Sequence, residues 1–312
     1  MIGWRFTKPI LLAALAVTLL SGTHHVKPKP GEPLANQLFG AKKAGSKQMP
    51  QVYGYYDNGC VAGGEQLPET GPTWQAMRLS RNRNWAHPEM IDFIKRLSVE
   101  ATKHGWAGLY IGDMTQPRGG PMTSSHASHQ IGLDADIWML PPKRLDLTIA
   151  ERESLSSISV RTDDQRNINS NWTPAHMEIL KAASKDKMVD RIFVAAAVKI
   201  EMCKRAGKDR DWLAKIRPLY GHNYHFHVRL KCPKGSPKCI SQTPIANISK
   251  GDGCDKSLTW WVTDYLNPPK VVPKKKTKKK TTTAKPKPRP RKAREFIIAD
   301  LPRQCVGVLK SK

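Results

Sequence analysis

The chain has 312 residues, which is enough for one large domain or two small ones around a substantial apolar core. Its hydrophobic fraction of 39% is typical of a globular protein and argues against a disordered or membrane-embedded chain. The formal net charge is +26, from 52 basic and 26 acidic residues. Half of that excess lies between Lys270 and Arg294, where 13 residues are Lys or Arg and none is acidic. Such a segment attracts polyanions, either nucleic acid or the anionic polymers of a cell envelope.

The N-terminus has the pattern of a secretory signal peptide. Arg5 and Lys8 precede an apolar run from Pro9 to Leu20, and small residues follow that run. The run is short for a membrane span, which needs about 20 apolar residues. We therefore assign residues 1–22 to a signal peptide that directs export, with an uncleaved anchor as the alternative, and residues 23–49 to a polar linker.

Helix and strand patterns follow one another through residues 50–268, which we assign to the main domain. Proline at the first helical position and apolar residues at helical spacing predict a helix from Pro88 to about Gly105, and a second helix begins with Thr173 as its N-cap. Mixed elements without a βαβ rhythm predict an α+β fold, with a central, mainly antiparallel sheet flanked by helices and long loops. The remaining expected elements are a helix at 195–206 and strands at 109–112, 133–140, 191–194 and 224–230.

The composition changes at residue 269. Residues 269–294 are dominated by Lys, Pro and Thr, so they cannot form an apolar core, and their like charges repel one another. We expect a disordered insertion that either adheres to anionic envelope polymers through Lys270–Arg294 or is only a solvated loop. Residues 295–312 regain apolar character and contain Cys305, so we expect this C-terminal segment to be tied back to the domain.

An even number of cysteines in an exported chain predicts disulfides. Six cysteines allow fifteen pairings, and the short spacing of Cys232 and Cys239, with Pro and Gly between them, favours that local pair. No Cys-x-x-Cys pair occurs, which argues against a thiolate zinc site. The six residues are Cys60, Cys203, Cys232, Cys239, Cys254 and Cys305.

Two short segments concentrate histidine and aspartate, one ending at Asp136 and the other at His227. Side chains alternate with period two along a strand, so Asp136 falls on the polar face of one strand, and His225 and His227 on the polar face of another. If the strands pair with these faces shared, the carboxylate and the imidazoles converge. His129 lies in the Gly-bearing turn before the first strand and can fold back to join them.

Two imidazoles and a carboxylate suit a catalytic zinc site, which keeps three protein ligands and leaves one position for water. The set His129, Asp136 and His227 supplies those ligands, and zinc lowers the pKa of a bound water to about 7. His225 stands about 6–7 Å from His227 along the strand, within reach of that water as a general base or as a stabiliser of the oxyanion. The alternatives are hydrogen-bonded surface histidines, or a four-ligand site including His225 that would close the position hydrolysis needs.

The spacing of these residues resembles a known signature. His129-x6-Asp136 with His225-x-His227 is similar to the pattern of the LAS metallopeptidases, which include lysostaphin-type and D-Ala-D-Ala peptidases. Longer strings around them resemble one branch of that group, the penicillin-insensitive murein endopeptidases. Those strings are residues 112–121, 125–138 and 221–229, and the whole resemblance covers roughly residues 50–268 and the piece around Cys305.

The resemblance implies a periplasmic zinc endopeptidase that hydrolyses the D-alanyl–meso-diaminopimelyl cross-links of peptidoglycan, with a metal-bound water as nucleophile. It implies that the sheet carries one catalytic zinc on His129, Asp136 and His227. His225 would be the base and His222 would assist it. The implied disulfides are Cys60–Cys305, Cys203–Cys254 and Cys232–Cys239.

The family can also hold a second zinc at a dimer interface, so the resemblance allows a homodimer in which His126 contributes to that site. No histidine follows Asp163 or Asp164 at the spacing such a site requires, so we expect His126 to line the groove or to support the metal ligands. Arg118 follows Pro117 and precedes two glycines, and its planar fork suits a substrate carboxylate.

Two other functions fit the same residues. A D-Ala-D-Ala carboxypeptidase would use the same ligands on uncross-linked stem peptides, and a non-catalytic envelope-binding protein would act through its basic segment. An intact His225 beside the expected ligands favours an enzyme. Nucleic acid is not expected as a partner, because a signal peptide is present and the domain lacks a basic aromatic motif.

Overall fold

The computed structural model describes residues 31–124, 126–248, 251–268 and 292–312. The expected signal peptide at 1–22 therefore lies outside the described residues, as does most of the basic insertion at 269–294. None of the described helices combines the length and the hydropathy that a membrane span needs.

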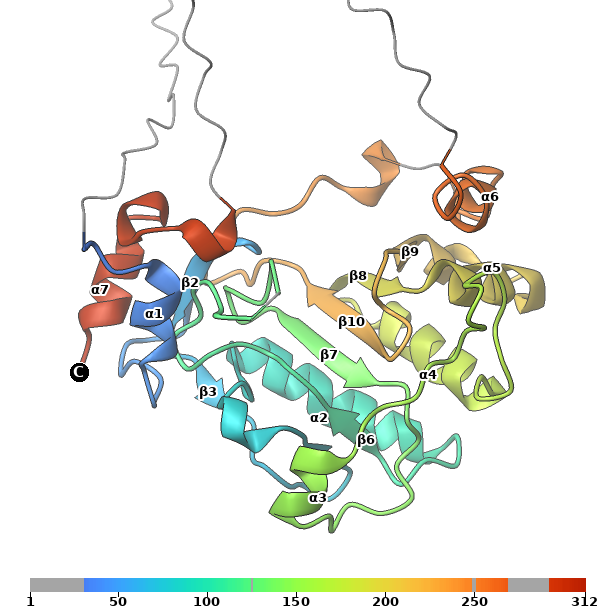
Figure 1. Ribbon diagram of the computed structural model, residues 1–312, viewed down its shortest axis with the longest axis horizontal. Helices are drawn as coiled ribbons and strands as arrows, with labels where there is room; N and C mark the ends of the chain where they lie inside the picture. Colours follow the sequence, from blue (N-terminus) through green and yellow to red (C-terminus); the bar gives the residue numbers. More distant parts are fainter. Residues whose placement is uncertain (1–30, 125, 249–250, 269–291) are drawn as a thin grey trace, which may run out of the picture.

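A six-stranded sheet lies at the centre of the described chain (Figure 1). Its strands are β4 (Trp74–Ala76), β6 (Leu109–Ile111), β7 (Asp134–Trp138), β8 (Val189–Val194), β9 (Ile216–Pro218) and β10 (His225–Leu230). The strand order is β4-β6-β7-β10-β8-β9. The inner pairs β6–β7, β7–β10 and β10–β8 are antiparallel, and the outer pairs β4–β6 and β8–β9 are parallel. The predicted α+β class with a mainly antiparallel sheet is confirmed.

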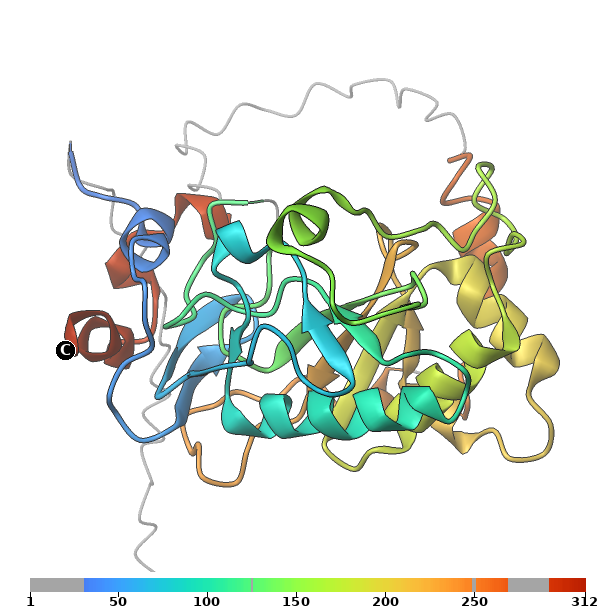
Figure 2. The ribbon, with the colours of Figure 1, turned by 90° about the horizontal axis from the view of Figure 1, so that it is seen from below.

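Two long helices, α2 (Pro88–Thr102) and α4 (Pro174–Lys185), cover one face of this sheet (Figures 1 and 2). Both begin with proline, as predicted, and at the start of α2 the His87 side chain accepts a hydrogen bond from the amide of the second helical residue. Their apolar stripes, with Ile94 and Ile179 fully buried, share one core with sheet residues such as Ile137. The alternate residues of β7 and β10 therefore point to the opposite face.

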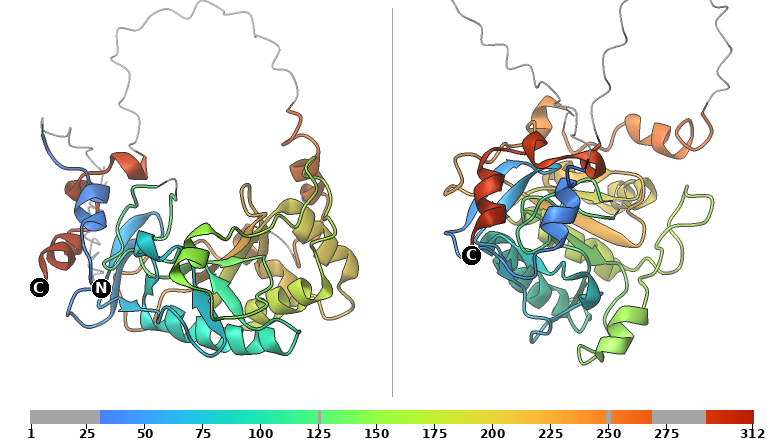
Figure 3. Two further views of the ribbon diagram at one scale, coloured as in Figure 1. Left: turned by 60° about the horizontal axis from the view of Figure 1, so that its bottom comes forward. Right: turned by 60° about the vertical axis from the view of Figure 1, so that its left-hand side comes forward.

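A smaller core joins the two ends of the described chain (Figure 3). It combines helix α1 (Ala35–Gly40), the hairpin of β1 (Gln51–Tyr55) and β2 (Asn58–Ala62), and helix α7 (Gln304–Lys310). The Cys60–Cys305 disulfide links β2 to α7, so the C-terminal segment is tied back across the insertion. The stretch assigned to a linker at 23–49 contains α1, whose Phe39 is fully buried in this core.

The other disulfides hold connecting segments in place. Cys203–Cys254 joins α5 (Ala196–Arg205) to the segment before α6 (Ser257–Val262), and Cys232–Cys239 closes the loop after β10. All three pairs are those that the resemblance implies. The remaining elements are β3 (Glu65–Gln66), β5 (Trp85–Ala86), α3 (Ile149–Ser154) and 3-10 helices at Leu79–Arg81, Asp211–Lys215, Ile245–Asn247, Ala293–Glu295 and Ile298–Asp300.

Candidate metal centre and active site

Strands β7 and β10 pair with their polar faces shared, which meets the condition under which the carboxylate and the imidazoles are expected to converge. In the antiparallel register His227 lies opposite Asp136, and Arg229 lies opposite Asp134. His225 begins β10 on the same face. A carboxylate and two imidazoles therefore meet on the side of the sheet away from α2 and α4.

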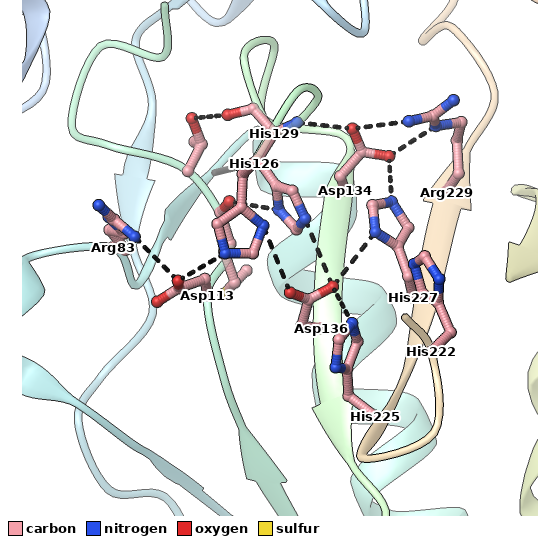
Figure 4. Close-up of polar contacts among 12 residues, drawn as sticks. Arg83, Asp113, His126, His129, Asp134, Asp136, His222, His225, His227 and Arg229 are labelled. Atoms are coloured by element: carbon pink, nitrogen blue, oxygen red, sulfur yellow. Dashed lines mark hydrogen bonds and ion pairs between the residues drawn. The ribbon is translucent and has the colours of Figure 1, made fainter. Parts of the chain in front are cut away.

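His129 reaches this face from the turn that precedes β7 (Figure 4). Its φ is 65° and that of Gly132 is 74°, so two left-handed residues fold the chain back. The His129 amide donates to Asp134 Oδ2 at 3.1 Å, and the Thr115 hydroxyl donates to the His129 carbonyl at 2.6 Å. The ring is fixed as well, because Nδ1 lies 2.6 Å from the Met114 carbonyl oxygen and Nε2 is left to face the sheet.

Asp136 lies at the centre of four histidines (Figure 4). Its Oδ1 atom is 3.2 Å from His227 Nδ1, 3.4 Å from His129 Nε2 and 3.5 Å from His225 Nε2. Its Oδ2 atom is 3.8 Å from His126 Nδ1. Burial by itself would raise the pKa of Asp136, but the neighbouring His225 and His129 hold that pKa well below its usual value. The carboxylate is therefore ionised at neutral pH.

Three buried atoms at the centre of this cluster are acceptors when the rings of His129 and His227 are neutral. His129 Nδ1 faces the Met114 carbonyl and His227 Nε2 faces Asp134 Oδ1 at 2.9 Å, so these two nitrogens carry the ring protons. His129 Nε2 and His227 Nδ1 are then acceptors, and both point at Asp136 Oδ1. Among the described residues, the buried atoms His129 Nε2 and Asp136 Oδ1 have no hydrogen-bond partner. Converging nitrogen and oxygen acceptors of this kind fit a zinc ion.

Two overlapping sets of three residues could hold the ion. The ligand atoms of His126, His129 and Asp136 all lie within 4.8 Å of one another. The second set replaces His126 with His227, whose Nδ1 is the nitrogen nearest to Asp136 Oδ1. The two sets differ in which oxygen of Asp136 they use, since His126 faces Oδ2 and His227 faces Oδ1.

A buried ion-pair network supports His227 from behind. Asp134 is fully buried, and its Oδ1 accepts a hydrogen bond from Arg229 Nε at 2.7 Å as well as facing His227 Nε2. Burial would raise the pKa of Asp134, but the charges of Arg229 and His227 lower it strongly. The guanidinium of Arg229 also lies 4.2 Å from the centre of the Tyr56 ring. The sequence places Asp134 on the polar face of its strand but gives no sign of this role, which depends on the pairing with β10.

If a zinc ion is bound through His227, replacing Asp134 with asparagine should weaken its binding about 10- to 100-fold, because the partner that orients the His227 ring is then uncharged. The same change leaves Arg229 buried without its counter-charge, so the free energy of unfolding should fall by about 3 kcal/mol. Competition with a chelator of known affinity and thermal unfolding measure the two effects. Asp92→Asn, at an exposed position of α2, is the matched control and should change neither quantity. Unaltered zinc affinity in Asp134→Asn would exclude the supporting role.

His126 lies at the rim of the site between two carboxylates. Its Nε2 is 3.0 Å from Asp113 Oδ2, and its Nδ1 faces Asp136. Asp113 follows β6 and also contacts Arg83 at 2.9 Å and Arg81 at 3.0 Å. Burial raises the pKa of Asp113, but the hydrogen bond from His126 and the two arginines lower it to about 2. Asp113 is not expected as a site residue from the sequence; its place two residues after β6, a strand that pairs with β7, is the signal that could have indicated it.

His225 and His222 border the site on the β10 side (Figure 4). The His225 side chain is 24% exposed, so a ligand in the groove can reach it. The His222 ring lies 5.1 Å from that of His225, and its Nδ1 is 2.8 Å from the Tyr220 carbonyl oxygen. Burial lowers the pKa of His222 to about 4, and it also lowers the pKa of His225 against the opposing charge of Asp136. Both rings are therefore neutral at pH 7 and able to accept a proton.

Two adjoining hollows share His126, Asp136 and His225. One extends toward Arg78 and Trp138, and the other extends toward the end of the β1–β2 hairpin. An extended molecule that occupied both hollows would have its middle portion beside Asp136.

The structure corrects the expectation that Arg118 binds a substrate carboxylate. Arg118 is 7% exposed, and its guanidinium donates to the Ala44 carbonyl at 3.2 Å. It also donates to the carbonyls of Val308, Leu309 and Ser311 at the end of α7, at 2.9, 3.0 and 2.6 Å. A cation at a helix C-terminus satisfies carbonyls that the helix leaves unpaired. Arg118 therefore fastens α7 to the domain.

Replacing Arg118 with methionine should lower the free energy of unfolding by about 2–4 kcal/mol, because buried carbonyls lose a charged donor. The KM for a peptide substrate should not change, since the guanidinium does not reach the groove. Denaturant unfolding and steady-state kinetics on the same variant separate the two effects. A raised KM at unchanged stability would restore the original expectation.

Comparison with known proteins identifies the family. The family model described as penicillin-insensitive murein endopeptidase matches residues 52–310. The chain belongs to this family. A penicillin-insensitive murein endopeptidase from Haemophilus influenzae is 41% identical over 217 residues, which cover 70% of this chain and 73% of the relative. Proteins of the same name from Pectobacterium atrosepticum and Klebsiella pneumoniae are 38% and 40% identical, and cover 81% and 73% of this chain and 85% and 81% of their own lengths.

The match to the penicillin-insensitive murein endopeptidases includes the whole cluster around Asp136 and continues past the basic insertion to α7. The resemblance drawn from the histidine and aspartate spacing is thereby confirmed. Helix α1 lies before the range that the family model matches.

Proposed function

We propose that the protein is a zinc-dependent endopeptidase that hydrolyses the D-alanyl–meso-diaminopimelyl cross-links of peptidoglycan. One observation carries the metal assignment: His129 Nε2, Asp136 Oδ1 and His227 Nδ1 converge, and the first two are buried without a hydrogen-bond partner among the described residues. Peptidoglycan is favoured as the substrate because the relatives are named murein endopeptidases.

His129, Asp136 and His227 are the ligands that we favour for a single catalytic ion. All three are at least 95% buried, and the far nitrogens of both rings are held by fixed oxygens, which sets their tautomers. His126 is more exposed and faces the other carboxylate oxygen, so we assign it to the rim of the site. If a second ion binds, as His126 allows, it would lie on the Oδ2 side of Asp136.

A zinc ion held by these residues supplies Lewis acidity toward the scissile carbonyl and lowers the pKa of a water molecule to about 7. His225 is placed to take a proton from the attacking water, because its ring is neutral and its Nε2 lies at the groove side of Asp136. His222 lies beside His225 and supports its orientation or the developing negative charge. His225 can afterwards give its proton to the leaving amine.

The substrate is an extended polymer, which agrees with two hollows that meet at the cluster. We place the protein in the periplasm, because murein lies there and the first 22 residues have the pattern of a signal peptide. Anionic envelope polymers are further candidate partners for Lys270–Arg294, nearly all of which lies outside the described residues. Disulfides suit that oxidising compartment.

Removal of the metal tests this proposal. A chelator should abolish the cleavage of cross-linked muropeptide dimers, and added Zn²⁺ should restore it, whereas penicillin should have no effect. Elemental analysis should find one zinc per chain before chelation. Full activity in protein shown to contain no metal would contradict the assignment.

A further inference from the structure

One of the two hollows is lined by two arginines that the proposed mechanism does not use. It extends from Asp136 and His225 along Trp138 to the side chains of Arg78 and Arg81, and we call it the Arg78 groove. Trp138 is 9% exposed and belongs to a buried apolar cluster with Met77, Tyr110 and Leu147. The proposed base and two arginines therefore border one space.

The two arginines lie at the two ends of a turn that hydrogen bonds to α3 hold in place. The 3-10 helix Leu79–Arg81 lies between two left-handed residues, Arg78 with a φ of 57° and Asn82 with a φ of 50°. Glu153 of α3 accepts hydrogen bonds from the amide and the hydroxyl of Ser80, at 2.8 and 2.9 Å. The turn thus has both a defined backbone and an anchor on α3, which fixes where Arg78 enters the groove.

The guanidinium of Arg78 has N–H donors that can bind an anion. Its Cζ lies 5.8 Å from the centre of the Trp138 ring, and its Nη2 donates a long hydrogen bond to Ser156 Oγ at 3.4 Å. Among the described residues, no carboxylate oxygen lies within 4.0 Å of its guanidinium nitrogens. The neighbouring Arg81 shares the carboxylate of Asp113 with a second arginine. Arg78 is therefore the arginine of this groove without a direct carboxylate partner among the described residues. Its acidic neighbour is Glu153, whose pKa is lowered by hydrogen bonds from the turn and by the charges of Arg78 and Arg81.

We propose that Arg78, assisted by Arg81, binds the free carboxylate of the diaminopimelyl residue that supplies the nitrogen of the scissile amide. The assignment rests on the proposed function. In a D-alanyl–meso-diaminopimelyl cross-link, that nitrogen is bonded to a carbon that also bears a carboxylate. The anion therefore enters the site together with the scissile bond, and a planar guanidinium can bind it through two parallel N–H donors. The methylene groups of the same residue then lie over Trp138.

Two cross-linked dimers that differ only in this carboxylate, free or amidated, test the assignment. The wild-type protein should cleave the free acid with a kcat/KM about 10- to 100-fold higher, as expected for hydrogen bonds to a charged group. In Arg78→Gln the kcat/KM for the free acid should fall to that for the amide, and the value for the amide should stay the same. Arg78→Lys keeps the positive charge but loses the planar pair of N–H donors, so it should retain part of the preference for the free acid. Arg205→Gln, at an exposed arginine of α5 paired with Glu201, is the control and should retain all of it.

Equal kcat/KM values for the two dimers in the wild type would overturn the proposal, as would an undiminished preference in Arg78→Gln. A binding measurement distinguishes failure of the proposed carboxylate site from failure of the proposed function. Calorimetry with an uncross-linked stem tripeptide that ends in diaminopimelate, free or amidated at the same carboxylate, involves no cleavage. Suppose that neither dimer is cleaved. The site would still be supported if the wild type bound the free tripeptide more tightly than the amidated one and Arg78→Gln removed this difference. Equal affinities of wild type and Arg78→Gln would overturn it.

Discussion

Replacing His225 with alanine should lower kcat for cross-link cleavage by about 10²- to 10⁴-fold, the usual contribution of a general base, while zinc stays bound. The reason is the position of the ring. His225 Nε2 is 3.5 Å from Asp136 Oδ1 on a partly exposed side chain, whereas His129 and His227 are buried and oriented by hydrogen bonds. Elemental analysis and steady-state kinetics on one preparation check both halves of the expectation.

The control for this variant is His104→Ala, which removes a histidine near the end of α2 whose ring lies 3.6 Å from Glu100. It should leave both kcat and zinc content unchanged. Loss of zinc from His225→Ala would show that His225 is a ligand, and the general base would then have to be another residue.

Replacing Asp136 with asparagine should remove zinc and activity together. Loss of a residue that only supports a ligand costs about 10- to 100-fold in affinity, so loss of a charged ligand should exceed about 100-fold. Asparagine keeps the size of the side chain, so the fold should be retained and thermal unfolding can verify it. Zinc titration of Asp136→Asn beside Asp134→Asn is a matched comparison, since the two carboxylates lie two residues apart on one strand face.

The expected order of zinc affinity is wild type, then Asp134→Asn, then Asp136→Asn. Equal losses in the two variants would mean that Asp136 acts only as a support. Near wild-type zinc content in Asp136→Asn would show that other members of the cluster hold the ion. His126 would be the first candidate, because it faces the same carboxylate.

The polar faces of β7 and β10 are the part of the site that the sequence predicts best. Alternation is a local property, and in both strands it separates charged and imidazole side chains from apolar ones. Once the apolar faces are buried against α2 and α4, the polar faces must coincide, and His227 comes to lie opposite Asp136. The turn residue His129 could be expected nearby because Gly132 permits a sharp reversal.

Residues whose role depends on distant contacts could not be assigned in this way. Arg118 and Arg78 both lie outside the predicted helices and strands. The residues next to them in the sequence do not show which one holds a helix in place and which one lines a groove. Arg118 meets carbonyls 190 or more positions away in α7, whereas Arg78 lies against Trp138. Helix α1 and the β1–β2 hairpin are too short for a clear period, and the core that holds them depends on a disulfide between residues 245 positions apart.

The most direct test of the proposed reaction is chromatography of the products formed from purified cross-linked muropeptide dimers by the zinc-loaded protein. We predict that dimers are converted to monomers and that no terminal D-alanine is released from uncross-linked stems. Intact dimers together with release of D-alanine from monomers would contradict the endopeptidase assignment and make the protein a carboxypeptidase. Intact dimers and intact monomers in protein shown to hold zinc would contradict both.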